Sequence, residues 1–170
     1  MSKYYLSHDP EKCIACYSCE VSCKIKNALP VGPRFCQLMT VGPKKIGELP
    51  KLGLVFMPCF HCERPWCVSA CPTGAMQKRA KDGIVFVEED LCIGCKNCLS
   101  ACPWGAPQWN SETGKAIKCD YCMDRVDAGL RPACVTKCLT QCLDFGPVSD
   151  NPSELKRNRF AASVAFPLAE

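Results

Sequence analysis

The segment from Cys92 to Pro103 constrains the chain most. It reads C-I-G-C-K-N-C-L-S-A-C-P, with three cysteines two residues apart, a fourth after three more, and a closing proline. This is the C-x2-C-x2-C-x3-C-P pattern of a 4Fe-4S ligand loop. A tight loop can direct Cys92, Cys95 and Cys98 at one cluster, while Cys102 is turned away toward a second cluster. Structural zinc usually takes two separated cysteine pairs, so this spacing argues against zinc.

Three other sets of four cysteines have related spacings. The first set repeats the 2, 2, 3 spacing, the second has a middle gap of four residues, and the last has a middle gap of eleven. The sets are Cys13, Cys16, Cys19 and Cys23; Cys59, Cys62, Cys67 and Cys71; and Cys119, Cys122, Cys134 and Cys138. Such recurrence indicates an internal repeat.

The strands and helices expected around these sets follow from local patterns. Residues 4–8 and 84–87 read as short strands that precede their cysteine loops at the same offset, and 115–118 is strand-like. Lys24 stands where Pro103 stands in the central loop, so residues 21–28 can continue as a helix. Two strands, 35–41 and 54–57, are expected in the insert, with turns at its Gly-Pro and Glu-Leu-Pro segments.

Composition excludes several classes. The protein has 170 residues and 18 cysteines, which would also suit a secreted disulfide scaffold. The first residues lack the apolar core of a signal peptide and a twin-arginine pair, so we expect a reducing, anaerobic cytoplasm. No apolar run approaches the roughly 18 residues that cross a bilayer, so no direct membrane span is expected.

The formal charge of +4 counts cysteine as neutral. Sixteen ligating thiolates add about −16 and four cubane cores return about +8, which leaves the loaded protein near −4. The lysines and arginines are then expected to compensate cluster charge, and no nucleic-acid partner is expected. For the basic segment 78–81 we expect a solvated turn, with a docking surface for an acidic partner as the alternative.

Two units make one two-cluster ferredoxin, each lending its fourth cysteine to the other's cluster. The middle units both end in Cys-Pro and lie close in sequence, whereas the outer units share Lys24 or Leu139 at the proline position. We therefore expect the middle pair and the outer pair to form separate modules. The expected ligand sets are Cys59, Cys62, Cys67 with Cys102; Cys92, Cys95, Cys98 with Cys71; Cys13, Cys16, Cys19 with Cys138; and Cys119, Cys122, Cys134 with Cys23.

The expected fold is small α+β: two bacterial-type 2[4Fe-4S] ferredoxin-like modules related by internal repeat, with a C-terminal helical tail. Residues 1–30 begin the outer module, 31–111 form the inner module with a preceding strand insert, 112–147 complete the outer module, and 148–170 form a docking tail with a helix at about 154–164. Cys36 and Cys142 are expected to be small buried residues and not ligands. His61 is expected to tune a neighbouring cluster, and Trp66 to cover it.

The sequence resembles the four-cluster iron–sulfur subunits of dimethyl-sulfoxide-reductase-type molybdenum and tungsten enzymes, including those of formate dehydrogenases, polysulfide reductases and hydrogenase-linked complexes. The resemblance covers about residues 5–146 and rests on the four cysteine motifs, the run Cys119-Asp-Tyr-Cys122-Met-Asp-Arg125-Val, and Pro132-Ala-Cys134. It departs at Lys24, Leu139 and Cys142. The family's pairing of first with fourth and second with third unit agrees with the ligand sets above, and small relatives also serve tungsten aldehyde oxidoreductases. The resemblance also implies that export with a signal-bearing partner stays open, because subunits of this family can be exported in that way.

Because every iron is saturated by sulfur, we expect no catalytic residue and a non-catalytic electron-transfer subunit. It would relay single electrons through four 4Fe-4S clusters between a catalytic molybdenum or tungsten subunit, or a hydrogenase, and another redox partner. Further copies of the protein or another electron-transfer subunit are possible partners. Two alternatives are a freely diffusing polyferredoxin and a structural zinc protein.

Overall fold

A computed structural model describes residues 3–46 and 49–147. The expected helix at 154–164 and the docking tail 148–170 lie outside the described residues. Within them, four two-stranded antiparallel sheets and short helices surround the cysteine loops.

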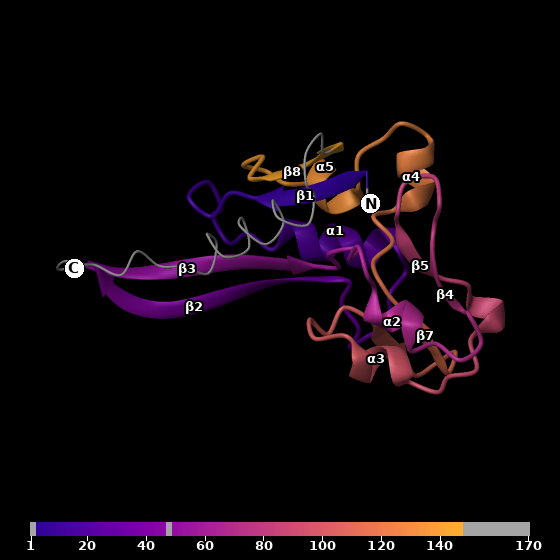
Figure 1. The fold of residues 1–170 in the computed structure, drawn as a ribbon. Coiled ribbons are helices and arrows are strands. Elements are labelled where there is room, and N and C mark those ends of the chain that lie inside the picture. Colours follow the sequence, from indigo (N-terminus) through magenta and orange to yellow (C-terminus); the bar gives the residue numbers. More distant parts are fainter. Residues whose placement is uncertain (1–2, 47–48, 148–170) are drawn as a thin grey trace.

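The two ends of the described polypeptide meet. Strand β1 (Tyr4–His8) pairs antiparallel with β8 (Leu143–Pro147), with His8 opposite Leu143. Helix α1 (Ser18–Lys26) packs against α5 (Ala133–Thr136), and the Ser18 hydroxyl donates to the Lys137 carbonyl at 2.9 Å. Helix α4 (Met123–Asp127) precedes α5 and fills part of the wide cysteine gap. The first and fourth cysteine units therefore lie side by side (Figure 1).

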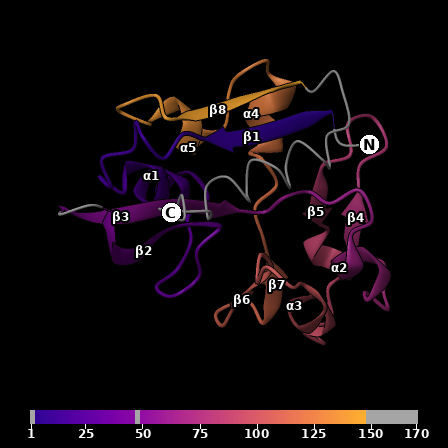
Figure 2. The ribbon, with the colours of Figure 1, turned by 60° about the vertical axis from the view of Figure 1, so that its left-hand side comes forward.

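The second and third units meet in the same way. Strand β4 (Met76–Lys78) pairs antiparallel with β5 (Val85–Val87), and α2 (Trp66–Ser69) packs against α3 (Asn97–Ala101). The 3-10 turn η1 (Glu89–Leu91) leads into the third loop. Strands β6 (Gln108–Asn110) and β7 (Lys115–Ile117) form a hairpin that leads to the fourth unit. Figure 2 shows these elements apart from β1, β8, α1 and α5.

The insert forms a hairpin longer than predicted. Strand β2 (Cys36–Ile46) pairs with β3 (Leu49–Pro58), and the hairpin projects away from the rest of the molecule (Figure 1). The turn predicted at Gly42-Pro43 is wrong, because the strand continues through it. The register shifts between Val41 and Lys44, and such a bulge accommodates a proline that cannot donate to the ladder.

Other local predictions are confirmed. Strands form at 4–8, 85–87 and 115–117. Helix α1 runs past Cys23 to Lys26, as expected where Lys24 replaces proline, whereas α3 ends at Ala101, just before Cys102 and Pro103. The same replacement at Leu139 does not lengthen α5, which ends at Thr136.

Two hydrophobic cores correspond to these two sets of elements. One joins the first and fourth units and includes Leu38 and Phe56 from the base of the β2–β3 hairpin together with Leu143. The other contains Met76, Val85 and Ala116 from β4, β5 and β7. Cysteines contribute to both cores, so burial of the apolar side chains also positions the thiols.

Candidate metal centres

All four cysteine loops share one backbone device. The residue just before the second cysteine has a positive φ in every loop: Ala15 at 54°, His61 at 44°, Gly94 at 72° and Tyr121 at 58°. Left-handed residues turn the backbone sharply, which lets consecutive thiols face one centre. Three of the four are not glycine, so the surrounding structure imposes this conformation at a cost.

Three of the expected ligand sets each line one cavity. One cavity is lined by Cys59, Cys62, Cys67 and Cys102. Another is lined by Cys71, Cys92, Cys95 and Cys98, and the remaining one by Cys13, Cys16, Cys19 and Cys138. In each cavity three thiols come from one loop and the fourth from the partner unit. None of the described residues that line these cavities is Asp or Glu.

The fourth expected set combines Cys23 of α1 and Cys134 of α5 with Cys119 and Cys122, which directly precede α4. The thiols of Cys23, Cys122 and Cys134 are buried. Burial raises the pKa of Cys134, and the neighbouring Cys23 and Cys122 raise it further. Burial likewise raises the pKa of Cys119, followed by the effects of Cys59 and Cys23. Cys23 is therefore close enough to all three cysteines of the last unit to raise their pKa values.

This chemistry fits iron–sulfur clusters. Burial raises the pKa of Cys19 to about 12 and that of Cys67 to about 11, so isolated thiolates would be unfavourable at these positions. A cationic cluster core removes that penalty because it binds the thiolates directly. Backbone N–H groups face two other expected ligand sulfurs: those of Met76 and Ala116 lie 3.4 and 3.5 Å from the thiols of Cys71 and Cys92.

The four sets follow one another in space. The pKa of Cys134, in the fourth-unit set, is raised by Cys19 of the first-unit set. The pKa of Cys119, also in the fourth-unit set, is raised by Cys59 of the second-unit set. Cys67 and Cys98 belong to the same hydrophobic core, the one that contains Met76 and Val85, and this core joins the second-unit and third-unit sets. At the two ends of this series Cys16 and Cys95 are exposed, whereas Cys122 and Cys134 in the middle are buried.

Comparison with known proteins gives the same result. The family described as "4Fe-4S dicluster domain" matches residues 52–148, and the "4Fe-4S binding domain" matches 10–32. The thiosulfate reductase electron transfer subunit of Salmonella typhi is 41% identical over 158 residues, which cover 92% of this sequence and 81% of that protein. The chain belongs to this family of iron–sulfur electron-transfer subunits of molybdenum reductases.

Two further relatives have the same character. A subunit of the anaerobic dimethyl sulfoxide reductase of Escherichia coli is 39% identical over 98% of this sequence and 82% of its own length. A subunit of the polysulfide reductase of Wolinella succinogenes is 41% identical over 91% of this sequence and 82% of its own length. As a family member the protein carries four 4Fe-4S clusters, is a non-catalytic subunit and transfers electrons. Neither a zinc protein nor a free polyferredoxin is favoured.

The two spare cysteines lie against expected ligands. Cys142 is buried, and its sulfur is 3.3 Å from that of Cys138. Cys36 is buried on β2, its thiol donates to the Cys19 carbonyl oxygen at 3.8 Å, and its interaction with Cys23 lowers the pKa of Cys23. His8 lines the same cavity as Cys138, and both ring nitrogens are buried with no hydrogen-bond partner in the described part of the protein. Burial lowers the pKa of His8, which favours its neutral ring.

His61 is buried between two cysteine units, whereas Trp66 is largely exposed. The His61 ring is fully buried; its Nδ1 accepts the Val85 backbone N–H at 2.9 Å, and its centroid lies 3.7 Å from that of Tyr121. The side chain therefore joins the second and fourth units, while the His61 backbone N–H lies 3.5 Å from the Cys59 sulfur. Trp66 borders that cluster's cavity, but it is 66% exposed and covers little.

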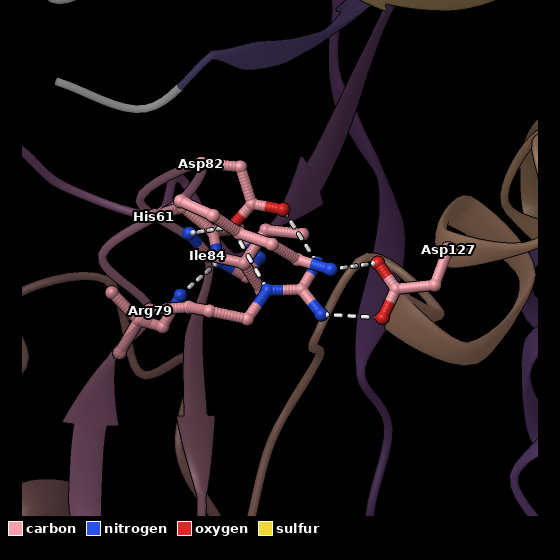
Figure 3. Close-up of polar contacts among 7 residues, drawn as sticks. His61, Arg79, Asp82, Ile84 and Asp127 are labelled. Carbon is pink, nitrogen blue, oxygen red and sulfur yellow. Dashed lines mark hydrogen bonds and ion pairs between the residues drawn. The ribbon is translucent and has the colours of Figure 1, made fainter.

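Two of the three cations in the basic segment 78–81 pair with carboxylates of the same molecule. Arg79 donates to both carboxylate oxygens of Asp82, with Nε 2.9 Å from Oδ1. Arg79 Nη1 also donates to Oδ2 of Asp127 on α4 at 2.8 Å (Figure 3). Lys81 Nζ donates to the other carboxylate oxygen of Asp127. These pairs tie the β4–β5 turn to the fourth unit and reduce the charge available to an acidic partner. The expected solvated turn is only partly solvated, because the Lys81 side chain is 59% exposed but that of Arg79 only 17%.

Lys118 is the functional candidate that the sequence pattern missed. It directly precedes Cys119 and is only 5% exposed. Its one available sequence signal was a lysine that continues the apolar strand Ala116-Ile117, where a charge needs a partner.

Proposed function

We propose that this protein carries single electrons, one cluster at a time, between a catalytic molybdenum or tungsten subunit and another redox partner. The observation that supports it most is that four sets of four thiols follow one another along the body of the molecule. When bound, the clusters supply the redox chemistry. The protein fixes their separation and sets their potentials through burial, charge and N–H groups.

We propose that the sixteen cysteines act in the four sets expected from the sequence. The swap of each fourth cysteine is supported by the cavities that combine Cys102 with Cys67, and Cys71 with Cys98. The recurring left-handed residue in every loop also supports an internal repeat behind the two modules. In this arrangement no iron offers an open position to a substrate.

We propose that electrons enter and leave at the two end clusters. Cys16 and Cys95 are exposed, and apolar side chains such as Ile14 at 63% and Ile93 at 68% exposure flank them. Apolar surface beside an exposed ligand suits a protein partner that brings its own redox centre close. The clusters of the fourth-unit and second-unit sets lie between these two ends, shielded from solvent, and pass electrons from one end cluster to the other.

The partners proposed are a molybdenum or tungsten catalytic subunit, or a hydrogenase, with further copies or another electron-transfer subunit as acceptor. The relatives are named as parts of thiosulfate, dimethyl sulfoxide and polysulfide reductases, which supports the first. The described part of the protein contains no helix long and apolar enough to span a membrane. We propose a cytoplasmic location and docking through residues 148–170.

Affinity purification of the tagged protein from native cells under anaerobic conditions tests this function. We expect a larger subunit to co-purify with molybdenum or tungsten, and deletion of residues 150–170 to lower its recovery while iron per polypeptide stays the same. A full-length protein that carries iron but elutes alone, without either metal, would contradict the relay between subunits. Unchanged recovery after the deletion would contradict the docking role of the tail.

A further inference from the structure

Lys118 lies at the boundary between the second-unit and fourth-unit cysteine sets. Its Nζ donates to the carbonyl oxygen of Val85 on β5 and to that of Cys119. Its side chain also lines the cavity of Cys59, Cys62, Cys67 and Cys102. A single ammonium group therefore adjoins the two middle sets, one in each module.

A buried ammonium needs negative charge close by, because burial of an unpaired charge is costly. None of the ion pairs found among residues 3–46 and 49–147 includes Lys118. Lys118 acts instead on cysteines: burial raises the pKa values of Cys67 and Cys119, and the charge of Lys118 opposes that rise in both, whereas Asp120 adds to it in Cys119. Four thiolates on a 2+ cubane core carry a net charge of about −2, and reduction adds one more negative charge.

We propose that Lys118 is a fixed positive charge that stabilises an added electron on both middle clusters. The inference rests on the proposed ligand sets. A shared charge raises the two reduction potentials together, so an electron that crosses between the modules is stabilised on either side of the boundary. The two carbonyl acceptors hold the ammonium in place, and its low exposure keeps solvent and salt from screening it.

Lys96 offers a matched control. It also adjoins a cysteine loop, between Cys95 and Cys98, but it is exposed and lies over the Trp109 ring at 4.1 Å. Its charge is screened by water and salt. Substitution of the two lysines therefore removes the same charge one residue from an expected ligand, in a buried and in an exposed environment.

The experiment is a redox titration of the full-length protein, purified anaerobically with its clusters and followed by electron paramagnetic resonance. In Lys118→Met we expect two of the four midpoint potentials to fall by at least about 59 mV, which for one electron is a tenfold change in the reduction equilibrium constant. Lys118→Gln, which keeps an N–H donor but loses the charge, should give the same shift. Lys118→Arg should keep all four potentials near the wild-type values, as should Lys96→Met.

Three results would overturn the inference: no shift in Lys118→Met and Lys118→Gln, a shift of one cluster or of all four, or an equal shift in Lys118→Arg. Cluster loss in both uncharged variants would also count against it, because Lys118 would then serve assembly. Iron content of the wild-type protein separates this test from the proposed function. A wild-type protein with fewer than four clusters contradicts the ligand sets, whatever Lys118 does.

Discussion

Replacement of Arg79 by methionine should destabilise the turn between β4 and β5. Arg79 binds Asp82, whose side chain is 5% exposed, and reaches Asp127 on α4 in the other module (Figure 3). Arg79→Met leaves the Asp82 carboxylate buried without its guanidinium partner, a change that typically costs about 3–5 kcal/mol. Asp82 keeps the Ile84 backbone N–H at 3.2 Å. We therefore expect the lower value, about 3 kcal/mol.

The rate of cluster loss measures this cost. Iron–sulfur proteins that unfold lose their cofactor, so stability is best compared as the rate at which visible absorbance disappears in anaerobic urea. About 3 kcal/mol corresponds to roughly a hundredfold in an equilibrium constant, which sets the upper limit of the rate increase. Asp127→Asn is the control, because it removes the exposed partner and leaves Arg79 paired with Asp82; its effect should be much smaller. Equal rates for the two variants would refute the importance of the buried pair.

Three other outcomes follow from the contacts around the cysteines and ions. Cys138→Ala should lower iron by about four atoms per polypeptide, whereas Cys142→Ala should keep all iron; the reverse result would make Cys142 the ligand. Cys36→Ala should keep iron content but lower the potential of the cluster proposed to use Cys23, because Cys36 stabilises the Cys23 thiolate and stabilisation of ligand charge favours the reduced state; an unchanged set of midpoint potentials would contradict this. Lys81 and Arg79 hold the pKa of Asp127 below its usual value. The contribution of Asp127 is therefore complete above the usual carboxyl pKa and lost as pH falls through the lower folded pKa, so the unfolding rates of wild type and Asp127→Asn should converge only in acid.

Cysteine spacing predicted the parts of the fold that depend on the clusters. The runs around Cys92 and Cys13 indicated tight loops that end in short helices, and the alignment of residues 84–87 with 5–8 indicated strands before those loops. Both patterns are local, and both elements form. The placement of Cys102 with the second loop's thiols could be inferred because a tight loop directs only three thiols at one centre.

Features that depend on packing between the modules could not be predicted from the sequence. The bulge that carries β2 past Gly42 and Pro43 reads as a turn in any local pattern. The charges of Arg79 and Lys81 look solvated until α4 brings Asp127 against them from 46 to 48 positions away. Lys118 looks like an ordinary strand lysine, because its carbonyl acceptor Val85 is 33 positions away in the sequence.

The number of electrons that one molecule accepts tests the central claim most directly. Coulometric reduction of the purified protein, with iron measured on the same sample, should give about four electrons and about sixteen iron atoms per polypeptide, about four irons per cubane. About two electrons with about eight irons, or a colourless protein that contains zinc, would contradict the four-cluster electron path.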